Sequence, residues 1–200
     1  MKLINIKKVY QGSYLSYYIA KYLNLDNNIK KYEFVSRNPL LTIDSFGNHE
    51  ACGVGIIAFS NDKKQILIEK EFRLGCNNYI YNFPAGLINK NEDSKNAAIR
   101  ELYEETGIKL NKIIDVLPEA YVFAATIDET LITIVGIGEG IPRLSDSYDE
   151  EISTKWYTKE EVKDLFDNKE LMSVRTQLFL YKWINEWEKL KWKNKKEDLY

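Results

Sequence analysis

The feature that most constrains this chain is an acidic cluster within residues 86–108, GLINKNEDSKNAAIRELYEETGI. Three glutamates, Glu101, Glu104 and Glu105, fall within five residues and are followed by Gly107. On a helix, residues three and four apart share a face, so these carboxylates repel one another. A helix selected only for its own stability would avoid this arrangement. We therefore expect a compensating positive charge, and a hard divalent cation held by carboxylate oxygens is the natural candidate.

The residues on either side of the cluster predict a loop that leads into a helix. Pro84 and Gly86 favour a tight loop, and Asp93 or Ser94 provides the N-cap of a helix that Gly107 ends. Apolar residues recur every three or four positions, so we expect one face to pack on a sheet and the opposite face to present the glutamates. The expected packing positions are Ala98, Ile99, Leu102, Tyr103 and Thr106.

The composition is that of a soluble globular protein, because 44% of the residues are hydrophobic and 29% are charged. A chain of 200 residues is long enough for one ordinary domain with a small extension. The net charge of -2 offers no general attraction to nucleic acid or anionic membranes. We read no signal peptide at the N-terminus, and no apolar run approaches the roughly 20 residues of a membrane helix.

Cysteine and histidine are scarce. Cys52 and Cys76 are too few for a disulfide framework, so a reduced, cytoplasmic setting is expected. The single histidine, His49, excludes most histidine-based catalysis and most zinc sites. Any chemistry here is therefore expected to be carboxylate chemistry. From the net charge, we expect no nucleic-acid or membrane partner.

Residues 1–38 predict an N-terminal antiparallel β meander. Tyr, Ile, Leu and Val recur at strand spacing, residues 26–28 supply a turn, and Asn38-Pro39 breaks the pattern. Such a meander has too little material to form a core alone, so it must pack on the main domain or on a second subunit. The main domain is expected to occupy residues 39–200.

The main domain alternates strand and helix patterns. We expect a hairpin over residues 53–60 and 64–72, and a C-terminal helix from residue 174 to about 192 that packs on the domain rather than on a membrane surface. The other expected elements are strands over residues 112–124, 129–138 and 152–158, and a helix over residues 159–166 capped by Thr158.

The spacing within residues 86–108 resembles the Nudix box, and every defined position is matched. The matching residues are Gly86, Glu92, Arg100, Glu101, Leu102, Glu104, Glu105, Gly107 and Ile108. The resemblance to the Nudix hydrolase family implies an α/β fold, with a mixed β-sheet sandwiched between helices. It also implies divalent-metal-dependent hydrolysis of a diphosphate linked to another group. A solvated acidic helix face is the alternative for the glutamates, and the complete spacing argues against it.

The resemblance also implies roles for individual residues. Glu101 and Glu105, one turn apart, are the best ligand pair for Mg²⁺ or Mn²⁺, with Glu104 joining them or bridging a second ion. The backbone carbonyl that the family uses before the box glycine falls on Ala85. Glu92 and Arg100 match the pair that ties the loop to the helix in this family, so a structural role is expected for both.

Flanking motifs resemble the ADP-ribose pyrophosphatase-like branch of the family. They are Glu71-Phe72-Arg73, Pro84-Ala85-Gly86, Asp128-Glu129, Glu150-Glu151-Ile152 and the element YEFVSR at residues 32–37. In that branch two subunits of a homodimer exchange their meanders and so complete both active sites. Tyr32 would then stack on adenine and Glu33 would bind its edge. Arg37 and Arg73 would meet phosphates.

The stacking assignments have a simpler alternative. Tyr14 is a weaker candidate for the other face of the base, and ordinary strand packing competes with stacking for both Tyr14 and Tyr32. Stacking on an aromatic plane suits any base, so these residues argue for a nucleotide more than for adenine.

The acidic loop at residues 145–151 completes the expected site. The resemblance places a further metal ligand at Glu150 and the family's general base at Tyr148. A tyrosine with an ordinary pKa of about 10 is a poor base at neutral pH. The base is then expected from a box glutamate or from Asp146, Asp149 or Glu151. The expected catalytic set is Glu101, Glu104, Glu105, Glu150 and Glu151.

These features predict hydrolysis of ADP-ribose, or a related nucleoside diphosphate sugar, to AMP and a sugar phosphate. A second departure from the branch, Ala125 in a glycine-like place within residues 123–127, leaves the substrate open. The alternatives are a dinucleotide or another nucleoside diphosphate compound, or a non-catalytic module that senses ADP-ribose. Capped RNA is least favoured, because the chain has no basic patch.

Overall fold

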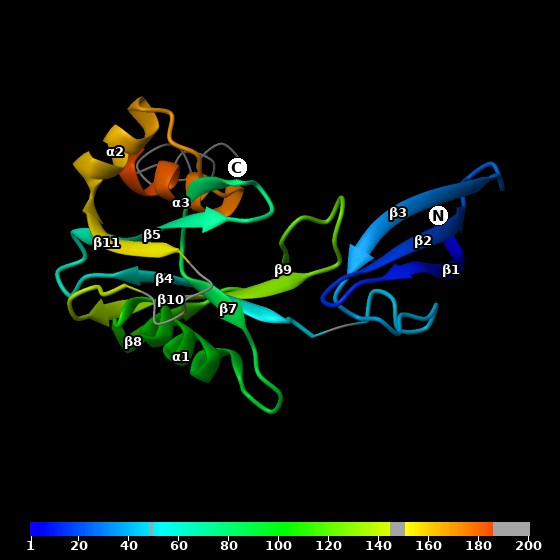
Figure 1. Ribbon diagram of the computed structural model, residues 1–200, viewed down its shortest axis with the longest axis horizontal. Coiled ribbons are helices and arrows are strands. Elements are labelled where there is room, and N and C mark those ends of the chain that lie inside the picture. Colours follow the sequence, from blue (N-terminus) through cyan, green and yellow to red (C-terminus); the bar gives the residue numbers. More distant parts are fainter. Residues whose placement is uncertain (49, 145–150, 186–200) are drawn as a thin grey trace, which may run out of the picture.

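The computed structural model describes residues 1–48, 50–144 and 151–185, and it shows a small N-terminal sheet beside a larger α/β domain (Figure 1). Among the described residues, the loop at residues 122–129 contacts the small sheet at Tyr32, Val35 and Ser36. The predicted fold, a mixed sheet between helices with an N-terminal antiparallel meander, is confirmed.

The meander consists of β1 (Lys2–Gln11), β2 (Ser16–Leu23) and β3 (Ile29–Ser36), paired in that order and antiparallel. Its inner face buries Tyr18 and Phe34 against Leu41 and Phe46, and the rings of Phe34 and Phe46 stack 4.7 Å apart. The segment after residue 38 therefore closes a small core on the meander. The domain boundary predicted at residue 38 stays a prediction.

The larger sheet runs in the order β11-β5-β4-β10-β8, with β6, β7 and β9 paired beside β5, β4 and β10. The β4–β10 pair is parallel and the other pairs are antiparallel. Helix α1 packs on one face, and α2 and α3 pack on the other (Figure 1). The strands are β4 (Gly53–Phe59), β5 (Gln65–Arg73), β6 (Asn78–Asn82), β7 (Ala85–Leu87), β8 (Lys109–Val116), β9 (Ala120–Tyr121), β10 (Thr130–Glu139) and β11 (Ile152–Thr158).

The predicted hairpin of β4 and β5 exists, but its strands separate almost at once. They pair only at Phe59 and Ile66, after which β4 continues with β7 and β5 continues with β6. The sheet therefore opens into a fork with two arms, a β4–β7 arm and a β5–β6 arm. The chain crosses from one arm to the other at Phe83 and Pro84, and the Pro84 carbonyl accepts from the Ile56 amide at 2.8 Å.

Helix α1 (Ser94–Thr106) begins and ends where the sequence predicts. The Asp93 side chain accepts hydrogen bonds from the amides of Lys95 and Asn96, as an N-cap does. Gly107 ends the helix in the left-handed region, with φ at 74°.

The predicted packing face of α1 is partly wrong. Ile99 and Tyr103 are 43% and 47% exposed, and the fully buried positions are Ala97, Ala98, Leu102 and Thr106. The two alanines let the helix lie close to the sheet, and this rotates the buried stripe relative to the prediction. Glu101 and Glu105 consequently lie beside the buried stripe and are half-buried, rather than opposite it.

Two further helices cover the other face. Helix α2 (Lys159–Asp167) is capped by Thr158, as predicted, through a capping box with Glu161. Helix α3 (Val174–Asn185) packs through Thr176 and Leu180, while the predicted continuation to residue 192 lies outside the described residues. In the part of the chain that the structure describes, no helix is long and apolar enough to cross a membrane.

Leu102→Ala is expected to lower the free energy of unfolding by about 2–5 kcal/mol, because the leucine is fully buried between α1 and the sheet. Ile99→Ala, on the exposed side of the same helix, is expected to cost about 1 kcal/mol or less. Urea unfolding of both variants measures the difference. Equal losses would contradict the observed rotation of α1.

Candidate active site

Helix α1 and strand β7 approach each other so closely that the helix carboxylates touch the strand backbone. A Cβ at Gly86 would lie 1.9 Å from the carboxyl carbon of Glu101, so only glycine fits there. The Ala85 amide donates to Oε2 of Glu105 at 3.3 Å. The structure therefore brings Ala85, Glu101 and Glu105, three of the predicted metal ligands, to one place.

Arg100 supplies a positive charge within the acidic cluster. Its Nη1 donates to Glu101 at 2.8 Å and to Glu104 at 3.1 Å. Its Nε and Nη2 donate to the two carboxylate oxygens of Glu92 at 2.9 and 2.8 Å. This bidentate pair lowers the pKa of Glu92 to about 2 and raises the pKa of Arg100.

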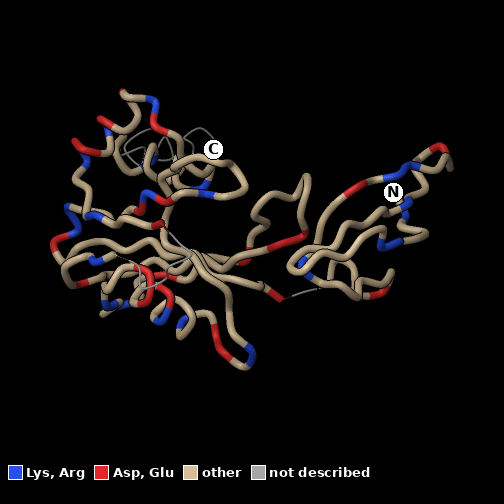
Figure 2. The backbone as a smooth tube through the Cα atoms, viewed as in Figure 1, with Lys and Arg blue, Asp and Glu red and all other residues tan. Residues whose placement is uncertain are grey.

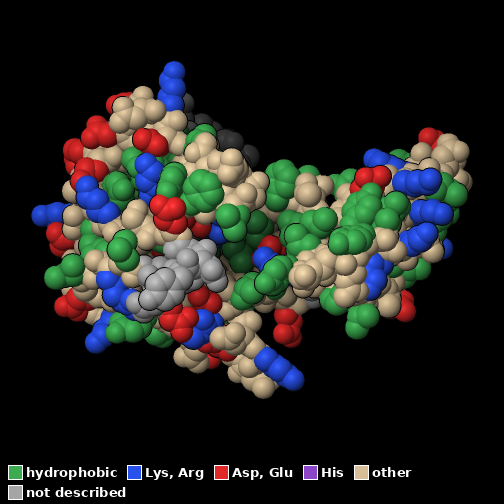
Figure 3. All heavy atoms as spheres, in the orientation of Figure 1, with side chains coloured by type: hydrophobic (Ala, Val, Ile, Leu, Met, Phe, Trp, Pro, Cys, Tyr) green, Lys and Arg blue, Asp and Glu red, His purple; other side chains and the backbone are tan. Residues whose placement is uncertain are grey.

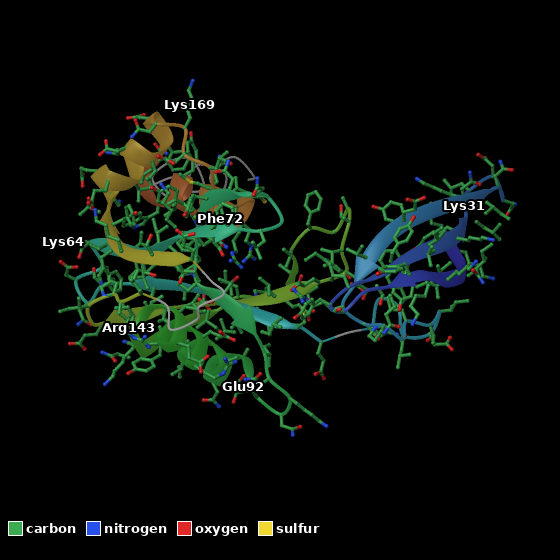
Figure 4. The ribbon with its side chains drawn as sticks, in the orientation of Figure 1. Lys31, Lys64, Phe72, Glu92, Arg143 and Lys169 are labelled. Atoms are coloured by element: carbon green, nitrogen blue, oxygen red, sulfur yellow. The ribbon has the colours of Figure 1, made fainter. Side chains whose placement is uncertain are left out.

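Glu92 and Arg100 join the loop before α1 to the helix and to β7. The Asn89 amide donates to Glu92 at 2.9 Å, and Nη2 of Arg100 also donates to the Leu87 carbonyl at 3.0 Å. Figure 4 shows Glu92 in the loop beneath α1. These contacts are those of the structural tie that the sequence predicts for this pair.

The residues beside β7 fit a hard divalent cation. Carboxylate and carbonyl oxygens are the ligands that Mg²⁺ prefers, and Glu101 and Glu105 are one helical turn apart beside Ala85. A cation there would compete with Arg100 for Glu101. Among residues 1–48, 50–144 and 151–185, no three His, Cys, Asp or Glu side chains form a metal-binding group. Glu150, the further predicted ligand, lies outside the described residues.

The β5–β6 arm carries a polar network opposite α1. Nη1 of Arg73 donates to Oε2 of Glu71 at 2.9 Å, and Nδ2 of Asn82 donates to Oε1 of Glu71 at 2.9 Å. Glu71 is 7% exposed, while the Arg73 side chain is 58% exposed. Arg73 thus extends from a fixed base toward solvent, and Figure 4 places its neighbour Phe72 on the same strand.

Glu151, which immediately precedes β11, is also attached to the β5–β6 arm. Its carboxylate accepts a hydrogen bond from the Tyr79 hydroxyl, which raises the pKa of Tyr79. Its backbone carbonyl accepts from the Phe72 amide at 3.0 Å. The other base candidates of the acidic loop, Asp146, Tyr148 and Asp149, lie in the stretch that the structure does not describe.

The meander meets the larger domain through the loop between β9 and β10. The Tyr32 hydroxyl donates to the Ala125 carbonyl at 2.6 Å, and the Val35 amide donates to the Thr126 carbonyl at 2.9 Å. Arg37 forms an ion pair with Glu129 at 3.1 Å. The loop that departs from the family pattern is thus the loop on which the meander rests.

The substrate-binding residues predicted in the meander are not brought together. Tyr32 and Glu33 are consecutive on β3, so their side chains point to opposite faces, and the Glu33 carboxylate raises the pKa of Tyr17. Tyr14 is 82% exposed. Figure 1 shows the meander well away from α1, and Figure 3 shows a wide notch between the two parts.

Charge divides between the same two parts (Figure 2). Lysines predominate on the meander, and a group of acidic residues marks α1 and its preceding loop. A single copy of the chain therefore presents a carboxylate centre and a separate, more basic arm.

Sequence reasoning missed the polar contacts at the base of α3. Oδ1 of Asn82 accepts from Ser173 at 2.8 Å and from Thr176 at 3.1 Å, and Arg175 lies within 3.4 Å of the same atom. No spacing rule signals this group, because Asn82 and α3 are about ninety residues apart in sequence. These residues fix α3 to the β5–β6 arm.

Known proteins with similar sequences support the family resemblance. An ADP-ribose pyrophosphatase of Saccharomyces cerevisiae is 36% identical over 105 residues, which is 52% of this chain and 44% of that protein. A methanol dehydrogenase activator of Bacillus methanolicus is 37% identical over 60 residues, 30% of this chain and 32% of that protein. The chain thus spans less than half the length of these curated relatives.

The fold and the sequence agree on the family. The crystal structure of an ADP compounds hydrolase superposes with a TM-score of 0.65 at 18% identity, covering 94% of this chain and 95% of that one. The NUDIX domain family model matches residues 50–176, well over half of the chain. The matched region holds α1, β7 and the carboxylate centre between them, and the chain belongs to the Nudix family.

Proposed function

We propose that this protein hydrolyses the pyrophosphate bond of ADP-ribose or a related nucleoside diphosphate sugar, giving AMP and a sugar phosphate. The observation that carries the proposal is the placement of Glu101 and Glu105 of a complete Nudix box against the backbone of Ala85 and Gly86. The similarity to a yeast ADP-ribose pyrophosphatase supports the choice of substrate class.

In this proposal the carboxylates of Glu101 and Glu105 and the carbonyl of Ala85 hold Mg²⁺ or Mn²⁺, together with Glu104 and Glu150. When bound, such an ion neutralises diphosphate charge and lowers the pKa of a coordinated water. Arg100 holds Glu101 and Glu104 in place at 2.8 and 3.1 Å. Arg73, whose head group is exposed on the β5–β6 arm, receives a phosphate.

Outside the Nudix box, Glu151 is the candidate for the general base that the structure describes. The Tyr79 hydroxyl binds its carboxylate and the Phe72 amide binds its backbone, so its position at the rim of the β5–β6 arm is fixed. A carboxylate held in this way can orient a water or accept its proton. The undescribed acidic loop supplies the competing candidates, Asp146 and Asp149.

The adenosine site is proposed to be completed by a second copy of the chain. Tyr32 lies on β3 and Arg37 directly follows that strand, and Figure 3 shows a notch between the meander and the larger domain. The meander also exposes large apolar side chains, among them Val9, Tyr10 and Ile29 at 47%, 68% and 61%. A homodimer would cover such side chains and bring each meander to its partner's carboxylate centre. Residues 1–38 then act as a dimerisation and substrate-binding arm of a hydrolase domain at 39–200.

Glu105→Gln is expected to reduce AMP formation from ADP-ribose with Mg²⁺ on the order of 100-fold or more, because a ligand of the catalytic ion is lost. Glu160→Gln, which removes an exposed carboxylate from α2, serves as the matched control and should retain wild-type activity. Phosphate release, after coupled phosphatase treatment, is measured across ADP-ribose, nucleotide sugars and dinucleotides. Tight ADP-ribose binding without turnover would instead indicate a sensor.

Mixing two inactive variants tests the shared site. Glu105→Gln damages the carboxylate centre and Arg37→Ala damages the meander, so each homodimer is expected to be inactive. In randomly exchanged dimers about one quarter of all sites would combine an intact centre with an intact partner meander. We therefore expect recovery of about one quarter of wild-type activity. Sites contained within single protomers would give no recovery, and light scattering would then report a monomer or an unrelated dimer.

The Glu92–Arg100 tie predicts a pH-dependent contribution to stability. The pKa of Glu92 is about 2 in the folded protein and about 4.3 in an unfolded chain. Because the folded-state pKa is the lower one, the stabilisation is complete above the unfolded value and is lost as pH falls toward 2. At pH 7 the urea concentration at the unfolding midpoint should therefore be lower for Glu92→Gln than for wild type. The difference between the two midpoints should narrow below about pH 5. A difference between the two urea midpoints that stays constant down to pH 3 would contradict this role.

A further inference from the structure

Arg175 is a cation in the fork of the sheet that the proposed function does not yet use. It lies in the first turn of α3, and its guanidinium reaches both arms. On the β4–β7 arm, a Cβ at Gly55 would lie only 2.5 Å from Nη1. On the other side, Nη2 lies 3.4 Å from Oδ1 of Asn82 and 3.5 Å from the Phe83 carbonyl. Gly55 thus makes room for a guanidinium at the floor of the fork.

The hydrogen bonds of Arg175 are incomplete. Its Nε is buried and has no acceptor in the part of the chain that the structure describes. Its two bonds, at 3.4 and 3.5 Å, are long compared with the usual 2.9–3.0 Å or so for such contacts. Burial lowers the pKa of Arg175, and the neighbouring Arg73 lowers it further. A guanidinium with five donors in this setting retains most of its capacity to bind an anion.

The surrounding side chains position Arg175 without saturating it. Glu71 already accepts from Arg73 and Asn82, and Oδ1 of Asn82 is shared with Ser173 and Thr176. The carboxylates of Glu69 and Glu71 favour the charged form of Arg175. The two arginines and two glutamates balance in charge, so an entering anion meets two guanidinium groups rather than a net negative field.

Arg175 is adjacent to the carboxylate centre. Gly55, which lies beneath its guanidinium, is paired with Ala85 in the β4–β7 ladder. The Ala85 amide in turn binds Glu105 at 3.3 Å. A diphosphate reaching from Arg73 on one arm to Ala85 on the other would therefore pass over the floor of the fork. That floor is where the free donors of Arg175 are held.

We propose that Arg175 binds the diphosphate group of the substrate and forms, with Arg73, a cradle of two guanidinium groups across the fork. Arginine binds phosphate oxygens through two parallel N–H donors, which gives direction as well as charge. Two such groups favour a ligand with two linked phosphates over a ligand with one. The inference rests on the proposed function and adds to it a residue that selects diphosphates over monophosphates.

The test compares ADP and AMP binding by isothermal titration calorimetry with EDTA present, so that binding is read without turnover. Arg175→Gln should weaken ADP binding by about 10- to 100-fold, because the variant loses the hydrogen bonds from a charged donor to the phosphate. The same variant should weaken AMP binding by less than about threefold, because one phosphate can remain on Arg73. Lys182→Gln removes an equal charge from the last turn of the same helix, and is expected to change neither affinity.

Arg175→Lys keeps the charge but loses the parallel N–H donors of the guanidinium. Its ADP affinity should therefore lie between those of wild type and Arg175→Gln. It also provides a second reading if the glutamine variant unfolds. Equal weakening of ADP and AMP, unchanged ADP affinity in either folded variant, or no measurable ADP binding by wild type would overturn the inference. Wild type that binds ADP but does not hydrolyse ADP-ribose would overturn the proposed hydrolase and leave the diphosphate cradle standing.

Discussion

The separation of β4 from β5 is the constraint on which the rest of the structure depends. Once the two strands part after Phe59 and Ile66, each needs a new hydrogen-bonding neighbour, and β7 and β6 supply them. The crossing between these neighbours places Ala85 and Gly86 against α1 and leaves a fork that side chains can enter from α3. A continuous hairpin would have paired those backbone groups with one another and left no floor for a site.

Charge balance within the fork follows from the same geometry. Glu101 and Glu105 lie beside the buried stripe of α1, where the repulsion among the helix carboxylates would be costly without Arg100. On the facing arm Glu71 is balanced by Arg73 and Asn82. The facing arm is thus close to neutral, whereas the α1 side keeps an excess of negative charge, because the single Arg100 pairs with Glu92, Glu101 and Glu104. Arrangements of this kind hold charge ready for a ligand without first having to reorganise.

Local rules were sufficient for part of the fold and of the site. Asp93 and Gly107 as helix ends, Thr158 as a cap and the Glu92–Arg100 tie all involve neighbours in sequence, and all are observed. The rotation of α1 was not predictable, because it depends on how closely Ala97 can approach the sheet. The contacts of Asn82 with α3 join residues about ninety positions apart, and no spacing rule reports such a meeting. The sequence therefore predicted that the carboxylates would group beside Ala85, whereas it did not predict the contacts at the floor of the fork.

The distance between the meander and α1 separates two tasks that one pocket would otherwise combine. Under the proposed function, the carboxylate centre and the fork would contact groups common to every diphosphate, so this part of the site would depend little on what the diphosphate carries. The meander and the loop at Ala125 are joined through the Tyr32 hydroxyl and the Arg37–Glu129 ion pair. Under the proposed function they would contribute the aromatic and basic groups that distinguish one nucleotide from another. That loop lies outside the Nudix box, so its sequence can change without altering the box carboxylates. Under the proposed function, the departure at Ala125 from the family's glycine would therefore bear on the choice of ligand rather than on bond cleavage.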